Sequence, residues 1–113
     1  MDVQALSDYD QVEALPGVYL AQLAAGDETS IQHFHVEPGA EIPEHDHPHE
    51  QAGFIYQGAL TFFLDEDEVV CERGDSYVIP GHEPHGAENR GEEAVMGVDI
   101  FSPPRVNPDW AKD

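Results

Sequence analysis

Beyond residue 15 the chain is built from short apolar or alternating runs, each closed by a turn rich in Gly, Pro, Asp or Asn. No helical period of apolar positions persists for more than one turn in this part, whereas a two-residue alternation recurs. Many short strands at near-regular spacing are typical of an all-β sandwich or barrel. The runs that we expect to form strands are Val18–Ala25, Ser30–Val36, Ala52–Gln57, Ala59–Leu64, Val69–Glu72, Ser76–Ile79, His85–Glu88 and Glu93–Phe101.

The length of 113 residues allows one hydrophobic core and is too short for a second, which predicts a single domain. Residues 1–15 precede the strand pattern and are expected to form an arm or a short helix. Residues 16–104 are expected to form the β domain. Residues 105–113 follow the Pro103-Pro104 pair and are expected to be an irregular tail.

The charge of the chain is strongly one-sided, with 24 acidic residues against 4 basic ones and a net charge of −20. Such a surface lacks the basic face that nucleic acids and anionic membranes require, so we expect neither as a partner. The carboxylates run along the whole sequence, and lysine is almost absent. This is typical of a halophilic protein, whose self-repulsion is screened by molar salt. The alternative is an ordinary acidic cytosolic protein.

The sequence carries no sign of an oxidising compartment or of a membrane. Cys71 is the single cysteine and cannot form an internal disulfide. Residues 1–15 have neither the basic region nor the apolar run of a signal peptide, and no apolar stretch approaches the length of a membrane span. We therefore expect a soluble cytoplasmic protein.

One segment near the middle of the chain contains three histidines within five residues, followed by a glutamine. Side chains alternate along a strand, so in a regular strand the odd-numbered residues here would share one face, about 6–7 Å apart. His45 and His47 can then bracket one divalent cation, with Gln51 further along. By the same parity Glu50 points to the other face. His49 shares the face, but three consecutive positions cannot all reach one ion, so we expect it at the rim or behind the ligands.

A further histidine, His85, follows a second turn and has to approach from another strand. Imidazole nitrogens and amide oxygens bind divalent cations, and such neutral ligands leave the cation its full charge. We therefore predict a metal site formed by His45, His47, Gln51 and His85. Of the other histidines, we expect His33 and His35 to be structural or pocket-lining and His82 to lie at the surface.

The last expected strand carries a second group of informative residues. Asp99 and Phe101 share one face with a glycine, a mixture that suits a pocket wall. An inward carboxylate needs a partner or a role, and the alternative is that Asp99 caps a turn or pairs structurally with Arg105. The opposite face is purely apolar, so we expect it to pack between two sheets. It consists of Met96, Val98 and Ile100.

Arg105 is one of three arginines in a chain that has almost no basic residues. Arg73 and Arg90 lie in glycine-containing turns and have the character of surface residues. Arg105 instead follows Pro103-Pro104, whose rings stiffen the chain at the expected mouth of the barrel. A guanidinium there can bind a carboxylate bidentately. The alternative is a surface arginine that pairs with one of the many acids.

Two motifs in the sequence resemble those of the cupin family. The first is Gly39-x5-His45-x-His47-x3-Gln51-x6-Gly58, with Gln51 where a glutamate is usual. The second is Gly74-x5-Pro80-x4-His85-x3-Asn89, with His82 where a glycine is usual. The resemblance implies a double-stranded β-helix barrel of the jelly-roll type. It also implies that His45, His47, Gln51 and His85 are metal ligands inside the barrel.

A narrower resemblance covers nearly the whole chain and points to the KdgF-type cupins of pectin and alginate breakdown. That type of protein linearises 4,5-unsaturated uronate monosaccharides to the open-chain keto-uronate. The resemblance implies a metal-dependent isomerase and places Asp99, Phe101 and Arg105 at pocket positions. From what this ring opening requires, we expect Asp99 to carry the proton, Arg105 to anchor the substrate carboxylate and Phe101 to shape an apolar wall. The resemblance rests on the blocks His47-Pro48-His49-Glu50-Gln51, Gly74-Asp75-Ser76-Tyr77, Pro84-His85-Gly86 and Asp99-Ile100-Phe101-Ser102-Pro103-Pro104-Arg105.

Other functions are compatible with the same motifs. A three-histidine cupin dioxygenase that uses Fe(II), an isomerase or epimerase of another sugar acid, and a non-catalytic sugar-binding cupin would all use this barrel. Histidine and glutamine ligands accept Zn, Ni, Fe, Mn or Co, so the metal stays open. We expect a small sugar acid as the substrate and a homodimer paired through sheet edges.

Overall fold

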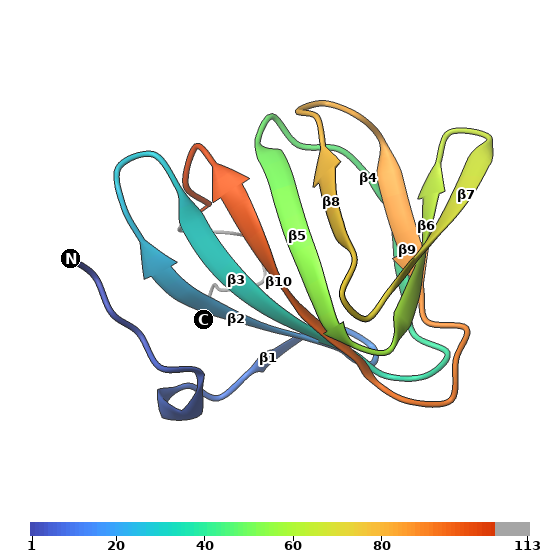
Figure 1. The fold of residues 1–113 in the computed structure, drawn as a ribbon, viewed down its shortest axis with the longest axis horizontal. Coiled ribbons are helices and arrows are strands. Elements are labelled where there is room, and N and C mark those ends of the chain that lie inside the picture. Colours follow the sequence, from blue (N-terminus) through green and yellow to red (C-terminus); the bar gives the residue numbers. More distant parts are fainter. Residues whose placement is uncertain (106–113) are drawn as a thin grey trace.

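The structure, a computed structural model, describes residues 1–105, which form ten β-strands and one short helical turn (Figure 1). The all-β fold expected from the sequence is confirmed. No helix within these residues is long and apolar enough to cross a membrane. The elements are η1 (Leu6–Asp8), β1 (Val12–Leu15), β2 (Val18–Ala25), β3 (Ser30–Val36), β4 (Glu41–His45), β5 (Glu50–Gln57), β6 (Ala59–Leu64), β7 (Asp67–Glu72), β8 (Ser76–Ile79), β9 (His85–Glu88) and β10 (Val95–Ser102).

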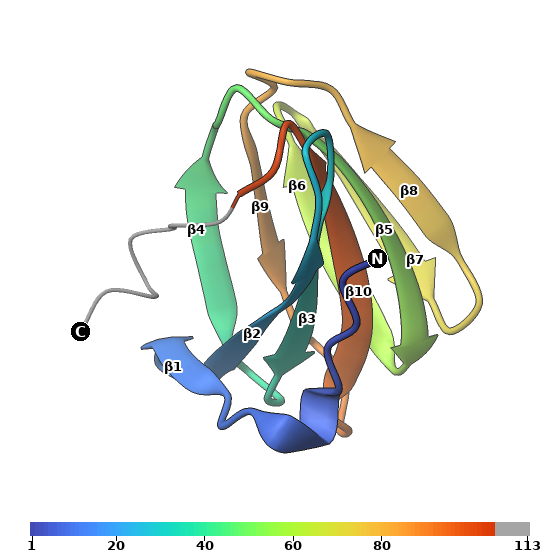
Figure 2. The ribbon, with the colours of Figure 1, turned by 90° about the vertical axis from the view of Figure 1, so that its left-hand side faces the viewer.

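The strands form two antiparallel sheets packed as a jelly-roll barrel (Figures 1 and 2). One sheet has six strands in the order β1-β2-β3-β10-β5-β8, and the other has four in the order β4-β9-β6-β7. In Figure 1 the larger sheet occupies the left and centre, and the smaller sheet the right. Strands that are neighbours in space are mostly distant in sequence, so the barrel brings together side chains from both halves of the chain.

The interior is filled by the inward-facing residues of both sheets. Along β10 these residues change from Val95 through Gly97 to Asp99 and Phe101, all buried. The interior is therefore apolar at one end, where burial of hydrocarbon stabilises the barrel, and increasingly polar at the other. The apolar core consists of Val18, Phe34, Val36, Ile55, Leu60, Phe62, Cys71, Ile79, Ala87 and Val95.

The parity argument for the histidine-rich segment assumed a regular strand, and the structure shows that this assumption does not hold. β4 ends at His45 in the four-stranded sheet, and β5 begins at Glu50 in the six-stranded sheet, so the chain crosses between the sheets here. Pro48 lies in the crossing and, lacking a backbone N–H, cannot donate to a strand ladder. The backbone N–H of His82 donates to the carbonyl of His47 over 2.7 Å and holds the crossing in place. Strand parity therefore does not explain which side chains of this segment meet.

The six-stranded sheet also starts earlier than the sequence pattern indicated. β1 pairs with β2, so residues 12–15 belong to the sheet, although they were assigned to the arm. β4 was also absent from the expected strands. Of the expected tail at 105–113, the described residues include Arg105 alone, and the rest lies outside them.

The apolar face of β10 does not pack between the sheets, which corrects that expectation. Met96 and Val98 are half-buried and Ile100 is exposed, all on the outer surface of the six-stranded sheet. The two sheets enclose one interior, and the β10 face that carries Asp99 and Phe101 fills it.

Candidate metal centre

Three histidines from different parts of the fold meet at the polar end of the barrel. His45 ends β4 and stands opposite His85, the first residue of β9, in the antiparallel register of these strands. His47 approaches from the crossing between the sheets. One ring nitrogen from each of the three lies within 4.8 Å of the other two. This spacing allows one cation to be bound by all three rings after small side-chain adjustments.

Each of these imidazoles is held by a backbone carbonyl two residues away along the chain. A carbonyl oxygen only accepts hydrogen bonds, so Nδ1 carries the proton in each ring and Nε2 keeps its lone pair. This is the tautomer that a metal-binding histidine needs, with the ring orientation fixed from behind. The Nδ1 atoms of His45, His47 and His85 lie 3.0, 3.0 and 2.8 Å from the carbonyl oxygens of Pro43, His49 and Glu83.

Gln51 faces the same cluster from β5. Its Oε1 lies 3.1 Å from Nε2 of His47. Because Nδ1 of His47 carries the proton, both of these atoms present lone pairs, and two lone-pair atoms at this distance call for a cation between them. A divalent metal ion bound by three imidazoles and one amide oxygen meets this requirement, so the donor set fits a metal. The neighbouring carboxylate of Glu50 is exposed and faces away.

Burial favours the neutral form of two imidazoles of this cluster, those of His47 and His85. The pKa of His47 and that of His85 are both lowered, chiefly because burial disfavours the charged ring, and the charge of Arg105 lowers them further. A lowered pKa means that protons compete less with a metal ion for Nε2 near neutral pH.

Asp99 is a buried carboxyl group beside the cluster, with 6% of its surface exposed. The hydroxyl of Tyr77 donates to its Oδ1 over 2.6 Å, and the side chain of Gln51 also hydrogen-bonds to it. Burial raises the pKa of Asp99 to about 6, against the opposing effects of these hydrogen bonds and of Arg105. A carboxyl group with a pKa in this range takes up and releases protons readily near neutral pH.

Phe101 and Arg105 form an adjoining wall. The buried ring of Phe101 meets the ring of His47 edge to face, with 5.7 Å between the centroids. The guanidinium carbon of Arg105 lies 5.3 Å from the centre of the Phe101 ring. The backbone N–H of Arg105 donates to the hydroxyl of Ser30 over 2.7 Å, which ties this part of the chain to β3.

These side chains open onto one cavity of about 510 Å³, a size typical of small-molecule sites. Its charged and polar lining includes His45, Gln51, His85, Asp99 and Arg105. The rest is mostly apolar and includes Leu20, Phe34, Ile42, Leu60 and Phe62. A ligand in this cavity therefore meets a metal-binding cluster, a carboxyl group and a guanidinium together.

Comparison with known proteins identifies the family. Residues 32–101, more than half of the chain, match the family described as the cupin domain. The protein belongs to the cupin family. The cupin resemblance of the two sequence motifs is thereby confirmed.

Two solved structures are similar to this cupin over nearly the whole chain. KdgF from Halomonas sp. superposes with a TM-score of 0.86 at 27% sequence identity, and the match covers 95% of this cupin and 97% of that chain. An RmlC-like cupin from Shewanella frigidimarina NCIMB 400 superposes with a TM-score of 0.83 at 25% identity, covering 93% of each chain.

Two curated relatives are similar over a shorter segment. H2HPP isomerase of Bacillus subtilis is 38% identical over 74 residues, which are 66% of this cupin and 31% of that protein. Acireductone dioxygenase of Klebsiella pneumoniae is 33% identical over 67 residues, which are 56% of this cupin and 37% of that protein. The cupin thus spans about a third of the length of these relatives.

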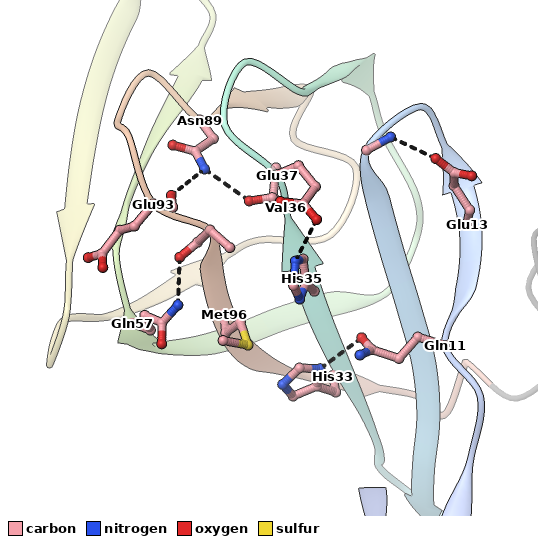
Figure 3. Close-up of polar contacts among 12 residues, drawn as sticks. Gln11, Glu13, His33, His35, Val36, Glu37, Gln57, Asn89, Glu93 and Met96 are labelled. Carbon is pink, nitrogen blue, oxygen red and sulfur yellow. Dashed lines mark hydrogen bonds and ion pairs between the residues drawn. The ribbon is translucent and has the colours of Figure 1, made fainter. Parts of the chain in front are cut away.

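Two histidines of β3 lie away from the cluster, on the outer face of the six-stranded sheet (Figure 3). Nδ1 of His33 is 3.3 Å from Oε1 of Gln11, and its Nε2 is 2.6 Å from the hydroxyl of Tyr56. Nε2 of His35 lies 3.2 Å from a carboxylate oxygen of Glu37. His33 and His35 were expected to be either structural or pocket-lining. Neither lines the cavity, and their contacts fit a structural role.

The remaining two histidines flank the cluster. The ring of His49 packs near Phe101, and its backbone carbonyl accepts a hydrogen bond from the Nδ1–H of His47. His49 therefore supports a ligand and is not one of the three clustered rings. His82 is exposed in its turn, as expected, and has a φ of 68°. That left-handed conformation explains why the cupin motif usually has a glycine there.

Sequence reasoning did not single out Tyr77 and Gly53 as parts of the site. Tyr77 reaches Asp99 from β8, and Gly53 lies on β5 between the two. A glycine at an inward position of an alternating strand marks the close approach of another group. Gly53 occupies such a position, and this was the available signal.

Proposed function

We propose that this cupin is a metal-dependent isomerase that opens the ring of 4,5-unsaturated uronate monosaccharides to give the open-chain 4-deoxy-5-keto-uronate. One observation carries the proposal: a buried carboxyl group, Asp99, shares a cavity with Arg105 and the histidine–glutamine cluster. The similarity to KdgF from Halomonas sp. over nearly the whole of both chains supports it. The name of the Bacillus subtilis relative, an isomerase, agrees with the reaction class.

The reaction moves one proton within the substrate. The hydroxyl group on C1 loses its proton, the bond between C1 and the ring oxygen breaks, and C1 becomes an aldehyde. The electron pair of the broken bond stays on the former ring oxygen, which forms an enolate with C4=C5. Protonation at C4 then converts C5 to a ketone. The proton lost at C1 balances the proton gained at C4, so no oxidant or reductant is consumed.

Asp99 is suited to carry this proton. As a carboxylate it accepts the proton of the C1 hydroxyl, and as a carboxylic acid it protonates C4. A pKa raised to about 6 by burial keeps both forms accessible near neutral pH. Its hydrogen bonds to Tyr77 and Gln51 hold the carboxyl group in one orientation during both transfers.

Arg105 and the metal-binding cluster are suited to an anionic substrate. The Arg105 guanidinium would bind the uronate carboxylate bidentately, while Phe101 beneath it limits where the sugar ring can lie. A divalent cation held by His45, His47, Gln51 and His85 would supply Lewis-acid stabilisation to the negative charge that develops on the ring oxygen.

The test follows the ultraviolet absorbance of the C4=C5 bond in 4,5-unsaturated galacturonate. Metal-loaded protein is expected to remove this absorbance, a chelator to stop the reaction, and added metal to restore it. His33→Ala, which changes a histidine outside the cavity, is the control. If folded, metal-loaded protein leaves the absorbance unchanged, the proposal is wrong.

A dioxygenase is the second candidate, because two acireductone dioxygenases of Klebsiella match this cupin at 33% identity over 67 residues. Three neutral imidazoles would also hold Fe(II), and a dioxygenase then needs molecular oxygen as co-substrate. Oxygen uptake by Fe(II)-loaded protein with enediol, phenolic or thiol substrates, and no effect on unsaturated uronates, would favour this function.

A further inference from the structure

Three inward positions on neighbouring strands form a straight row beside the metal centre. Asp99 on β10 stands opposite Gly53 on β5, and Gly53 stands opposite Tyr77 on β8. Asp99 and Tyr77 are therefore two strands apart, about 10 Å across the sheet. Nevertheless the Tyr77 hydroxyl donates to Oδ1 of Asp99 over 2.6 Å.

The absence of a side chain at Gly53 makes this contact possible. A Cβ atom placed there would lie 2.2 Å from Cζ of Tyr77, 2.3 Å from its hydroxyl oxygen and 2.5 Å from Oδ1 of Asp99. These distances are far below van der Waals contact, so any side chain at this position would displace both groups. The phenol ring passes directly over the Gly53 backbone, and Phe62 packs against it with 4.7 Å between the ring centroids.

The row connects to the metal centre through the amide of Gln51. This side chain hydrogen-bonds to Asp99 and also places Oε1 3.1 Å from Nε2 of His47. The carboxylate of Asp99 accepts hydrogen bonds, so the amide nitrogen of Gln51 must face it, and the amide oxygen then faces the cluster. The reversed amide would set an oxygen against the carboxylate and turn its N–H groups toward the metal-binding atoms. The hydrogen bond to Asp99 thus fixes the orientation of the Gln51 amide, so that its oxygen and not its nitrogen faces the metal site.

We propose that Tyr77 is a positioning residue of the metal centre: it holds Asp99, and through Asp99 it keeps the oxygen of Gln51 directed at the metal. Gly53 is the residue that permits this contact. The proposal rests on the metal site of the proposed function, and it does not depend on which substrate is turned over. A tyrosine that served the fold alone would contribute through packing on Phe62, and its hydroxyl would then have no effect on metal binding.

Tyr77→Phe separates these two roles, because it keeps the ring and removes the hydroxyl. The matched control is Tyr19→Phe, which removes a hydroxyl from the outer face, where the Tyr19 ring packs edge to face on His35. The probe is Co²⁺, with affinity measured by competition against a chelator and the ligand field by visible absorption. Loss of a group that orients a metal ligand typically weakens affinity by 10–100-fold. We expect roughly that loss and an altered spectrum in Tyr77→Phe, and wild-type behaviour in Tyr19→Phe.

A double-mutant cycle tests whether Tyr77 acts through Gln51. In a Gln51→Ala background the amide is gone, so Tyr77→Phe should cause no further loss of Co²⁺ affinity. An equal loss in both backgrounds, or no loss in either, would overturn the proposal. If Tyr77→Phe does not fold, Gly53→Ala takes its place, because its methyl group separates the Tyr77 hydroxyl from the Asp99 carboxyl group without removing either. Altered Co²⁺ binding without any uronate turnover would support this proposal and reject the proposed reaction.

Discussion

The His33-x-His35 and His45-x-His47 segments of this cupin have the same pattern in sequence and opposite surroundings in the structure. His45 and His47 lie at the polar end of the barrel, where backbone carbonyls hold Nδ1 and leave Nε2 toward the cluster. His33, on the outer face, has both ring nitrogens in contact with side chains, those of Gln11 and Tyr56. The comparison teaches that the partner of the second nitrogen, and not the spacing, distinguishes a metal-binding histidine from a structural one.

The same contrast extends to the two faces of the six-stranded sheet. On the inner face Asp99 is 6% exposed and Gln51 is 7% exposed, while on the outer face Val78 is 61% and Phe54 44% exposed. Burying polar groups costs free energy unless they are hydrogen-bonded, and Tyr77, Gln51 and Asp99 meet that condition among themselves. A fold selected for stability alone would favour apolar residues at these inner positions, so the polar end of the interior is best explained by its chemistry.

The largest expected effect concerns the histidines themselves. His85→Ala removes one of the three clustered imidazoles, so Co²⁺ affinity should fall well beyond the roughly 100-fold expected for a supporting residue. His33→Ala, on the outer face, should leave the affinity unchanged. Competition against a chelator measures both. Equal losses in the two variants would abolish the distinction between inner and outer histidines.

Much of this contrast was accessible from the sequence, because it follows from short-range patterns. The alternation of apolar and polar residues revealed the all-β fold. The positions of His45, His47 and His85 next to two predicted turns suggested a metal-binding cluster. The structure brings Gln51 to the cluster and leaves Glu50 exposed, as the alternation of side chains along a strand suggested. The physical reason is a different one. The segment changes sheets at Pro48, and the two strands that supply His45 and Gln51 belong to different sheets.

Long-range contacts were not accessible in this way. Nothing local to Tyr77 reveals that its hydroxyl reaches Asp99 across β5, since that depends on the register of three strands. The apolar face of β10 was assigned to the interior because apolar residues are usually buried. In this barrel the interior is taken by the face that carries Asp99, and hydrophobicity alone could not reveal that choice.

Asp99→Ala, measured at saturating metal, is expected to have the next largest effect. Loss of a positioned proton carrier typically lowers kcat by 10²–10⁴-fold. The control is Glu50→Gln, which changes an exposed carboxylate on the neighbouring strand. Uronate turnover is followed in the ultraviolet after metal content has been measured for each variant. An Asp99→Ala protein that turns over at the wild-type rate would remove Asp99 from its assigned role.

The pH dependence of stability tests the burial of Asp99 directly. Its pKa is raised from 3.8 to about 6, so between these values the folded protein holds a proton that the unfolded chain has lost. The contribution of Asp99 to the free energy of unfolding should therefore decrease as pH rises through this window, by roughly 3 kcal/mol at about 1.4 kcal/mol per pH unit.

Asp99→Asn lacks this titration. Its stability relative to the wild type should rise by roughly the same 3 kcal/mol between pH 4 and pH 7, and stay level above that. Urea unfolding of the two metal-free proteins at constant high salt gives the difference. A difference that does not change with pH would show that the carboxyl group is not buried as described.

Among these variants, Arg105→Ala is expected to have the smallest effect, and this effect should be a weaker binding of the substrate. Hydrogen bonds to a charged partner contribute about 1.5–3 kcal/mol, so KM for the uronate should rise by roughly 10–100-fold while kcat changes less. Arg73→Ala is the control, because Arg73 is exposed in the turn between β7 and β8 and does not line the cavity. Steady-state kinetics on both variants should separate them, and an unchanged KM in Arg105→Ala would exclude it as the carboxylate anchor.

The most direct test of the central claim is the mass of the product formed from 4,5-unsaturated galacturonate by metal-loaded protein in air. If the protein isomerises the uronate by proton transfer through Asp99, we expect the ultraviolet absorbance to disappear and the product to have the mass of the substrate. In D₂O the same reaction should place one deuterium on C4. A product that has gained oxygen atoms, or a substrate that remains unchanged, would contradict the isomerase account.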